Sequence, residues 1–185
     1  RIGLYDPGKW LRPHIPETAG LEILQRPEAA GEAGLSGWIY VDDMLDSFEA
    51  PPCLVLRPRS LVVGVGCKRG TGAAEIGAAV DKVFEDHNLS LLAVRNLATV
   101  ELKENEEGLQ ELLKLHDWPA VYYSVSELQT PLEVPSPSEK VREHLGVESV
   151  CEKAAILSGC AKELLVPKKI LGKVTVAVAR VASSW

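Results

Sequence analysis

The sequence lacks the long apolar runs that a membrane-spanning protein needs. Nowhere in its 185 residues does a hydrophobic stretch approach the ~20 residues of a transmembrane helix. It also lacks the charged start followed by an apolar segment that is typical of a secretory signal. We therefore expect a soluble protein of the cytoplasm that does not act at a membrane.

Positive charge is also in short supply. The chain has 20 Lys and Arg against 26 Asp and Glu, which gives a formal net charge of −6. A general nucleic-acid-binding protein needs a basic face, so the composition argues against nucleic acid as a partner. A local basic pocket for a small anion remains compatible with this charge balance.

Metal-binding patterns are absent as well. The four cysteines (Cys53, Cys67, Cys151 and Cys160) are far apart without a CxxC spacing, and the four histidines are scattered. We therefore expect no metal site and reduced thiols. The acidic residues Asp42, Asp43 and Asp46 match no calcium loop. They are interpreted as a solvated strand end, with a carboxylate metal cluster as the alternative.

The first 58 residues differ in character from the rest. They hold seven of the 12 prolines and no long helical period. We expect an irregular segment with short strands, without an independent core, packed against the following domain or a neighbouring chain. Because the chain begins with Arg1 and its single methionine is Met44, it is expected to be a fragment of a longer protein. The strand-like runs are 2–5, 21–24, 38–41 and 54–56.

Residues 59–185 alternate between strand and helix patterns, which predicts a three-layer α/β/α domain with a mixed, mostly parallel sheet. Residues 61–65 are apolar on both faces, so this strand should be central. The final connection is too short for a crossover, so the last two strands should be antiparallel. The predicted strands are 61–65, 89–94, 120–125, 163–166 and 173–181, and the predicted helices are 72–87, 106–116, 138–145 and 149–158.

Three Ser-x-x-Glu sequences have the spacing of a capping box, in which the serine and glutamate side chains satisfy amides at a helix start. This is the simplest interpretation of all six residues. The pairs are Ser124 with Glu127, Ser136 with Glu139, and Ser149 with Glu152.

The glycine-rich segment 64–71 (GVGCKRGT) follows the predicted central strand and precedes a helix, where open α/β sheets bind ligands. It is no Walker A loop, and its glycine spacing is GxGxxxG instead of the dinucleotide GxGxxG. The next predicted strand ends in Arg95 and Asn96 without an acidic residue. A nucleotide cofactor is therefore disfavoured.

The loop fits an anion better. Helix N-terminal amides attract negative charge, Lys68 and Arg69 add two cations, and Thr71 can cap the helix or donate to a ligand. We expect the amides of residues 70–73 to be open to solvent or to an anion. The alternative is a tight turn with two solvated bases. Cys67 beside these cations should have a lowered pKa, and it is either a nucleophile or a packing residue.

Three further residues carry charge that could serve the loop. Glu75, one helical turn on, is either solvated or a general base aimed at the loop. Lys168 and Lys169 follow Pro167, which should end the strand there. If that strand runs parallel to residues 61–65, both basic sites share one sheet edge and border one concavity. The alternative is a solvated hairpin turn.

At these residues the sequence resembles a known family. The run 61–75 (LVVGVGCKRGTGAAE) resembles the C-terminal domain of the CbiG family, the cobalt-precorrin-5A hydrolases, a domain that also occurs alone as CobE. The resemblance covers about 54–181, residues 1–53 resemble the middle of CbiG more weakly, and the family's N-terminal domain is expected to be missing. Further matching motifs are LQELL (109–113), YSVSEL (123–128), PSEKV (137–141), GVESVCEKAA (146–155), LLVPK (164–168) and VTVAVAR (174–180).

The resemblance implies a role in the anaerobic route to vitamin B12. There the hydrolase opens the δ-lactone of cobalt-precorrin-5A and releases acetaldehyde, giving cobalt-precorrin-5B. The alternative is a non-catalytic corrinoid-binding domain, with catalysis in the missing domain. No cofactor is implied, because the tetrapyrrole substrate carries the cobalt; other enzymes of the cobalamin pathway and a second copy of the chain are the expected partners. The candidate catalytic residues are Lys68 or Arg69 for charge stabilisation and Glu75 or Glu152 for acid–base chemistry. The candidate substrate-binding residues are Gly66, Cys67, Gly70, Thr71, Lys168 and Lys169.

Overall fold

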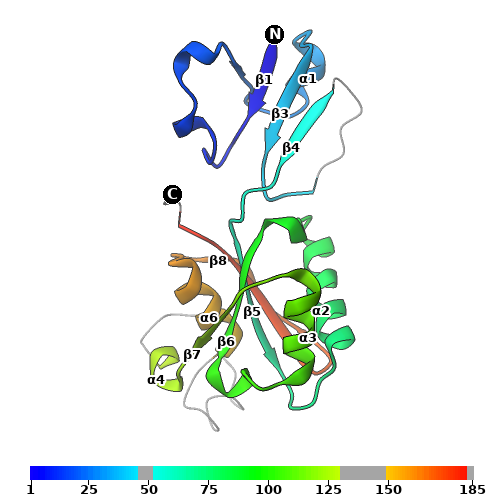
Figure 1. The fold of residues 1–185 in the computed structure, drawn as a ribbon, viewed down its shortest axis with the longest axis vertical. Coiled ribbons are helices and arrows are strands. Elements are labelled where there is room, and N and C mark those ends of the chain that lie inside the picture. Colours follow the sequence, from blue (N-terminus) through cyan, green and yellow to red (C-terminus); the bar gives the residue numbers. More distant parts are fainter. Residues whose placement is uncertain (46–51, 130–148, 183–185) are drawn as a thin grey trace. The chain divides into compact units, whose positions relative to one another are not determined.

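The computed structural model describes residues 1–45, 52–129 and 149–182. These residues form two compact units, one made of Arg1–Arg59 with Asn88–Ala93 and the other of Ser60–His87 with Val94–Ala182 (Figure 1). Among them, no helix combines the length and the apolar character needed to cross a lipid bilayer. Each unit is built around its own sheet.

The first unit contains a four-stranded, fully parallel sheet with the order β2-β1-β3-β4. The expected strand-like runs all appear in it, each within one residue of its predicted ends. Between the strands lie two 3-10 turns and one short helix. The elements are β1 (Ile2–Tyr5), the turns Arg12–His14 and Glu17–Ala19, β2 (Glu22–Ile23), α1 (Ala29–Glu32), β3 (Gly37–Val41) and β4 (Cys53–Leu56).

This unit has cores on both faces of its sheet, which differs from the irregular segment without a core that the sequence suggested. Side chains alternate along β3, so Trp38 and Tyr40 join one cluster while Val41 joins another with Leu4. The connections supply the cover, Trp10 for example packing on Leu4. Proline density therefore excluded long helices but not a sheet, because the proline-rich connections also carry the apolar residues that cover it.

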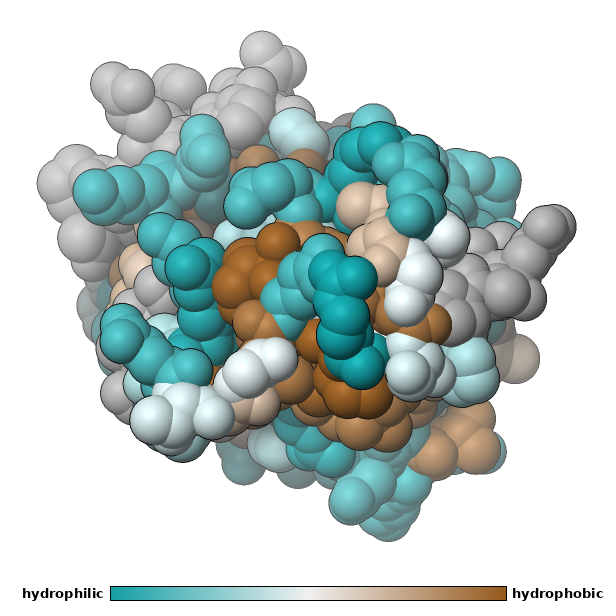
Figure 2. Space-filling model, turned by 90° about the horizontal axis from the view of Figure 1, so that it is seen from above, coloured by the Kyte–Doolittle hydropathy of each residue, from teal (hydrophilic) through white to brown (hydrophobic). Residues whose placement is uncertain are grey.

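Part of the apolar surface of this unit stays exposed. Leu54 and Val55 on the edge strand β4 are 57% and 40% exposed, and Ile2 on β1 is 41% exposed. Figure 2 shows apolar residues gathered within a hydrophilic rim on the face seen from above. Apolar atoms contribute much of the accessible surface of any folded protein, so apolar exposure by itself is common.

The second unit contains a five-stranded mixed sheet with the order β7-β6-β5-β9-β8. The strand β5 is central, β6 and β7 run parallel to it, and β9 runs antiparallel to both β5 and β8. This confirms the predicted α/β fold, the central strand and the antiparallel final pair. The strands are β5 (Leu61–Cys67), β6 (Val94–Val100), β7 (Ala120–Tyr123), β8 (Leu164–Leu171) and β9 (Val174–Arg180).

Helices cover both faces of this sheet. Figure 1 shows α2 (Ala73–Asp86) and α3 (Glu107–His116) on one side and α6 (Val150–Gly159) on the other. The glycine at position 64 lets α6 approach, since a Cβ there would lie 1.8 Å from the carbonyl oxygen of Cys151. Short elements complete the unit: a 3-10 turn at Glu101–Lys103 and the helix α4 (Val125–Leu128).

Several strand boundaries differ from the prediction, most of all those of the second strand and of β8. The second strand was expected at 89–94, but Leu91–Ala93 form a 3-10 turn and β6 begins only at Val94. The apolar run before Val94 belongs instead to the first unit, where Leu89 bridges to Met44. Pro167 does not end β8: this is an edge strand whose pairing shifts register around the proline, so no ladder bond from that position is needed.

The three predicted capping boxes have different outcomes. Ser124 and Glu127 form one at the start of α4, with both reciprocal hydrogen bonds present. Ser149 precedes α6 without a side-chain cap, because Glu152 reaches β8 instead and accepts from the Lys168 amide at 2.9 Å. Ser136, Glu139 and the predicted helix at 138–145 lie outside the described residues.

Candidate functional site

A pocket of about 770 Å³ lies where β5 and β6 end. The loop residues 69–72 form one wall, and Val100, the last residue of β6, begins the other. That second wall continues through Leu102, Lys103 and residues 105–108 into the first turn of α3. The carboxyl ends of parallel strands are the usual ligand-binding edge of an open α/β sheet.

The glycine loop is tightly folded at this edge. The Thr71 hydroxyl donates to the Lys68 carbonyl at 2.7 Å, and the Thr71 amide donates to the same oxygen at 3.3 Å. Gly70 has a φ of 72°, a left-handed conformation that glycine adopts without strain. Thr71 is buried and Lys68 and Arg69 are exposed, so the threonine shapes the turn while the cations project from it.

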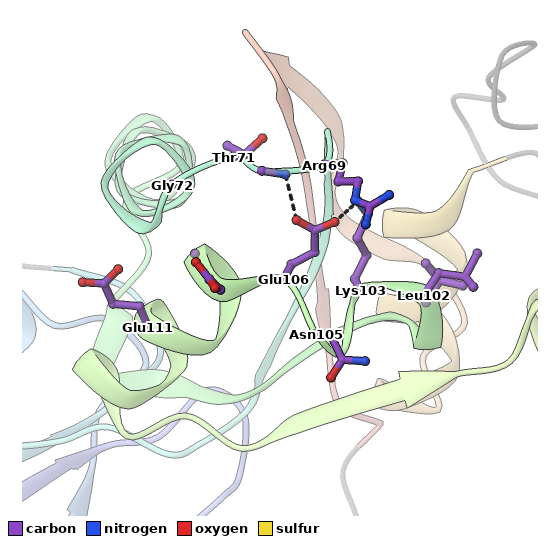
Figure 3. A pocket seen from close by; sticks show the side chains of 12 residues that line it. Arg69, Thr71, Gly72, Leu102, Lys103, Asn105, Glu106 and Glu111 are labelled. Atoms are coloured by element: carbon purple, nitrogen blue, oxygen red, sulfur yellow. Dashed lines mark hydrogen bonds and ion pairs between the residues drawn. The ribbon is translucent and has the colours of Figure 1, made fainter.

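Glu106, at the start of α3, ties the two walls together. Its Oε2 accepts from the Gly70 amide at 2.8 Å, and its Oε1 lies 3.0 Å from Lys103 Nζ (Figure 3). The Gly70 hydrogen bond, then Lys103, and also the charge of Arg69 lower the pKa of Glu106 below its ordinary value. The carboxylate therefore stays ionised and fills an anion position of the loop.

Gly108 brings the two helices close enough for this contact. A Cβ at Gly108 would lie 2.2 Å from the Thr71 carbonyl oxygen and 2.8 Å from the Ala73 nitrogen. Only glycine permits this approach, so the first turn of α3 packs directly on the start of α2. Both helices thus begin at the pocket, and their N-terminal dipole ends favour negative charge there.

The pocket walls carry both signs of charge. Arg69 and Lys103 are the cations, while Glu106 is already engaged and Glu107 and Glu111 are two further acids. Leu102, also on the wall, is 60% exposed and offers an apolar surface. The walls therefore combine an apolar surface with charges of both signs.

The predicted site residues are only partly brought together. Arg69, Gly70 and Thr71 line the pocket, whereas Lys68, Gly66 and Cys67 do not. Their positions follow from the loop, since the Lys68 amide donates to the Lys173 carbonyl at 3.0 Å and Thr175 Oγ1 donates to the Gly66 carbonyl at 3.2 Å. The amides of Gly70 and Thr71 are engaged within the chain, which differs from the open amides expected at 70–73.

Cys67 differs from its expected chemistry. Its thiol is half-buried at the end of β5, and loss of solvation raises its pKa, although the charge of Lys103 acts in the opposite direction. The expected lowering by Lys68 and Arg69 is absent because those side chains project into solvent. The thiol stays protonated at neutral pH, so the packing interpretation fits it better than the nucleophile.

The two candidate acid–base residues lie away from the pocket walls. Glu75 is 40% exposed and its Oε2 lies 3.5 Å from Lys173 Nζ. Glu152 is fully buried on α6, which covers the other face of the sheet, and holds the Lys168 amide. The geometry assigns Glu75 to the surface and Glu152 to the attachment of α6 to β8.

Lys168 and Lys169 also lie apart from the loop. The strand β8 does run parallel to β5, but Lys169 pairs with Val176, which in turn pairs with Val65. Lys169 is therefore level with the middle of β5, before the loop begins. Lysines, a proline and irregular pairing are typical of a protected sheet edge, and β8 has all three.

Lys103 and Glu106 are not among the site residues predicted from the sequence. The second strand was expected to end at Val94, whereas β6 ends at Val100 and these two residues follow within six positions. The same error weakens one argument against a nucleotide, because Glu101 follows the true strand end. The glycine spacing still differs from the dinucleotide pattern. In the part of the chain that the structure describes, no three His, Cys, Asp or Glu side chains are grouped as a metal site.

The residues that form both pocket walls lie within a segment that matches a known protein family. Residues 61–179 match the family described as "Cobalamin synthesis G C-terminus". The chain belongs to this family. Its pocket loop, β6 and the start of α3 all lie within the matched residues.

Two curated relatives carry the same name, cobalt-precorrin-5A hydrolase. The protein from Priestia megaterium is 40% identical over 126 residues, which is 68% of this chain and 33% of the relative. The protein from Salmonella typhimurium is 28% identical over 162 residues, covering 79% of this chain and 44% of the relative. The chain thus spans about a third to under half of the length of these two proteins.

Solved structures show the same domain. The crystal structure of CobE, described as a protein from the cobalamin biosynthetic pathway, is 28% identical with a TM-score of 0.61 and covers 68% of this chain and 93% of CobE. The cobalamin biosynthesis protein chiG from Agrobacterium tumefaciens is 30% identical with a TM-score of 0.53. The match covers 66% of this chain and 99% of chiG. A cobalamin biosynthesis protein G homologue from Sulfolobus solfataricus is 18% identical with a TM-score of 0.56. It shares the fold over 98% of this chain and 51% of its own chain.

Proposed function

We propose that this chain acts in cobalamin biosynthesis as the corrinoid-handling part of a cobalt-precorrin-5A hydrolase. In the proposed reaction, one water is consumed as the δ-lactone is opened, acetaldehyde leaves, and cobalt-precorrin-5B remains. The observation that carries the proposal is the pocket at the ends of β5 and β6, which lies entirely within the residues that match the family.

The chemistry of the pocket suits such a ligand. A precorrin combines an apolar macrocycle with acetate and propionate side chains. Exposed Leu102 offers a surface for a ring edge, and Arg69 and Lys103 offer charge-assisted hydrogen bonds to carboxylates. The cobalt would arrive with the substrate, so the proposal needs no resident cofactor.

A second candidate function is corrinoid binding without catalysis by this domain. Hydrolysis needs an acid–base group at the reacting atoms. Among the acids of the pocket, Glu106 is held by the loop, which leaves Glu107 and Glu111, while the sequence candidates Glu75 and Glu152 do not line the pocket. The solved structure of CobE favours this candidate, because CobE corresponds to this domain alone and is described as a pathway protein without a stated activity.

Turnover separates the two candidates. The chain is incubated with cobalt-precorrin-5A, acetaldehyde is measured by coupled NADH oxidation, and corrinoid binding is followed by absorbance. The full-length Priestia megaterium hydrolase serves as the control for substrate quality. Acetaldehyde release by the chain supports the hydrolase, binding without release supports the binding domain, and the absence of binding overturns both.

A further inference from the structure

A carboxylate of the chain itself occupies the cationic wall of the pocket. Glu106 meets the Gly70 amide at 2.8 Å and Lys103 Nζ at 3.0 Å, beside the charge of Arg69. The side chains of Glu106 and Lys103 are only 12% and 19% exposed. The contact between Glu106 and Lys103 is thus partly shielded from water, whereas the hydrogen bond from Gly70 is exposed. Charge interactions are stronger where water is partly excluded than at an open surface.

The groups that hold Glu106 are those that a ligand carboxylate requires: a backbone amide, an ammonium and a nearby guanidinium. The space around the loop is open, since a Cβ added at Gly70 or Gly72 would meet no atom within 4 Å. Figure 3 shows the Glu106 carboxylate directed at the loop, between its backbone and Lys103. A carboxylate arriving through the pocket would reach the same three groups.

We propose that the Gly70 amide, Lys103 and Arg69 form a carboxylate subsite, and that Glu106 occupies it until a ligand carboxylate replaces it. The inference rests on the proposed function only in the claim that the natural ligand is a corrinoid polycarboxylate. Because Glu106 is tethered, its effective concentration at the subsite is on the order of millimolar. A single free carboxylate competes poorly with it.

This occupancy makes Glu106 a specificity-determining residue. A ligand that is also held elsewhere in the pocket, for example on Leu102, presents its carboxylate with a comparable effective concentration and displaces Glu106. A small monoacid lacks that second attachment. The pocket therefore selects a large ligand with several carboxylates over small organic acids.

Removing the resident carboxylate tests the subsite. Glu106→Ala vacates the subsite, while Glu106→Gln removes the charge and retains an acceptor for Gly70. Glu111→Gln is the matched control, because Glu111 lines the same pocket and the structure describes no hydrogen bond from it to the loop. Glutarate is titrated into each protein, and the amide resonance of Gly70 is followed by NMR.

We expect glutarate to bind Glu106→Ala about tenfold more tightly than wild type, which corresponds to about 1.4 kcal/mol, and Glu106→Gln to lie between them. Glu111→Gln should change the affinity less than about threefold, as expected for loss of one screened charge. Equal affinities in wild type and both Glu106 variants would overturn the subsite. So would an equal gain in Glu111→Gln, or weaker binding by a folded Glu106→Ala.

A second titration with cobyrinic acid, a polycarboxylate corrinoid, separates this inference from the proposed function. If no protein binds cobyrinic acid while glutarate gives the expected pattern, the corrinoid proposal fails and the subsite stands. If cobyrinic acid binds wild type and Glu106→Ala equally, the subsite fails and the corrinoid proposal stands.

Discussion

The two units each use a carboxylate to hold a loop after a parallel strand, and they do so differently. In the first unit, Asp6 follows β1 and accepts from the amides of Trp10, Leu11 and Arg12 at 2.7 to 2.9 Å. All three donors lie within six residues of it. In the second unit, Glu106 accepts from one loop amide that lies 36 residues earlier in the chain.

The surroundings of the two carboxylates differ as well. Asp6 is 8% exposed and three amides share its two oxygens, so the contact is local and complete. Glu106 lies on the wall of an open pocket beside two cations. We infer that the Asp6 contact has a structural role, because all of its amide donors lie in the same loop and occupy both carboxylate oxygens. The Glu106 contact marks a binding position, because its donors face a cavity.

The largest effect should come from Asp6→Ala. It removes hydrogen bonds to a charged acceptor and leaves partly buried amides without partners, at a cost of about 3 kcal/mol. Urea unfolding followed by tryptophan fluorescence includes a signal from this unit, because Trp10 and Trp38 lie in its two cores; the buried Trp118 adds the signal of the second unit. Glu17→Ala, at an exposed position, should change the stability by less than about 0.5 kcal/mol. Equal stabilities of the two variants would contradict the structural role of Asp6.

A smaller effect, on binding, should separate two adjacent cations of the loop. Arg69 lines the pocket and Lys68 does not. Loss of a charge-assisted hydrogen bond in Arg69→Ala should weaken cobyrinic acid binding by about tenfold, as measured by absorbance titration. Lys68→Ala, which removes the same charge one residue earlier, should weaken it by less than about threefold. Equal losses of affinity in the two variants would show that binding depends on the overall charge of the loop and not on the position of Arg69 in the pocket wall.

Ser124→Ala should have a smaller effect again. Its hydroxyl accepts from the Glu127 amide at 3.2 Å, and Glu127 Oε2 accepts from the Ser124 amide at 2.7 Å, so this third carboxylate also closes its own turn. Loss of the cap should destabilise the second unit by about 1 kcal/mol in urea unfolding. Ser124→Asn retains a good N-cap and should lose less. A loss as large in the Asn variant would contradict the capping explanation.

Sequence patterns correctly predicted the features that depend on neighbouring residues. Residues 61–65 were identified as a central strand because they are apolar on both faces, and the Ser124 capping box follows from spacing alone. The contact between Gly70 and Glu106 joins elements far apart in sequence, and it depends on how closely Gly108 lets α3 approach α2. No period or motif states that distance. The end of β6 was misplaced for a related reason, since the apolar residues before Val94 pack in the other unit.

The smallest effect concerns the pH dependence of stability, and it tests whether Glu106 is ionised in its contact. The Gly70 amide and Lys103 lower the pKa of Glu106 in the folded state. In the unfolded chain this glutamate titrates at about pH 4.3. As the pH falls, the unfolded state therefore takes up the proton before the folded state does. The contribution of Glu106 is fully present above that pH and is lost as the pH falls through the lower folded-state pKa.

Urea unfolding of wild type and Glu106→Gln at about pH 6 and about pH 3.5 measures this contribution. The advantage of wild type over Glu106→Gln should be larger at the higher pH and should shrink toward the lower one. Glu111→Gln, which removes a carboxylate from the same pocket, should keep the pH dependence of wild type. An advantage that grows on acidification would mean that the folded state prefers the protonated form. Glu106 would then not be the resident anion that distinguishes this loop from the one closed by Asp6.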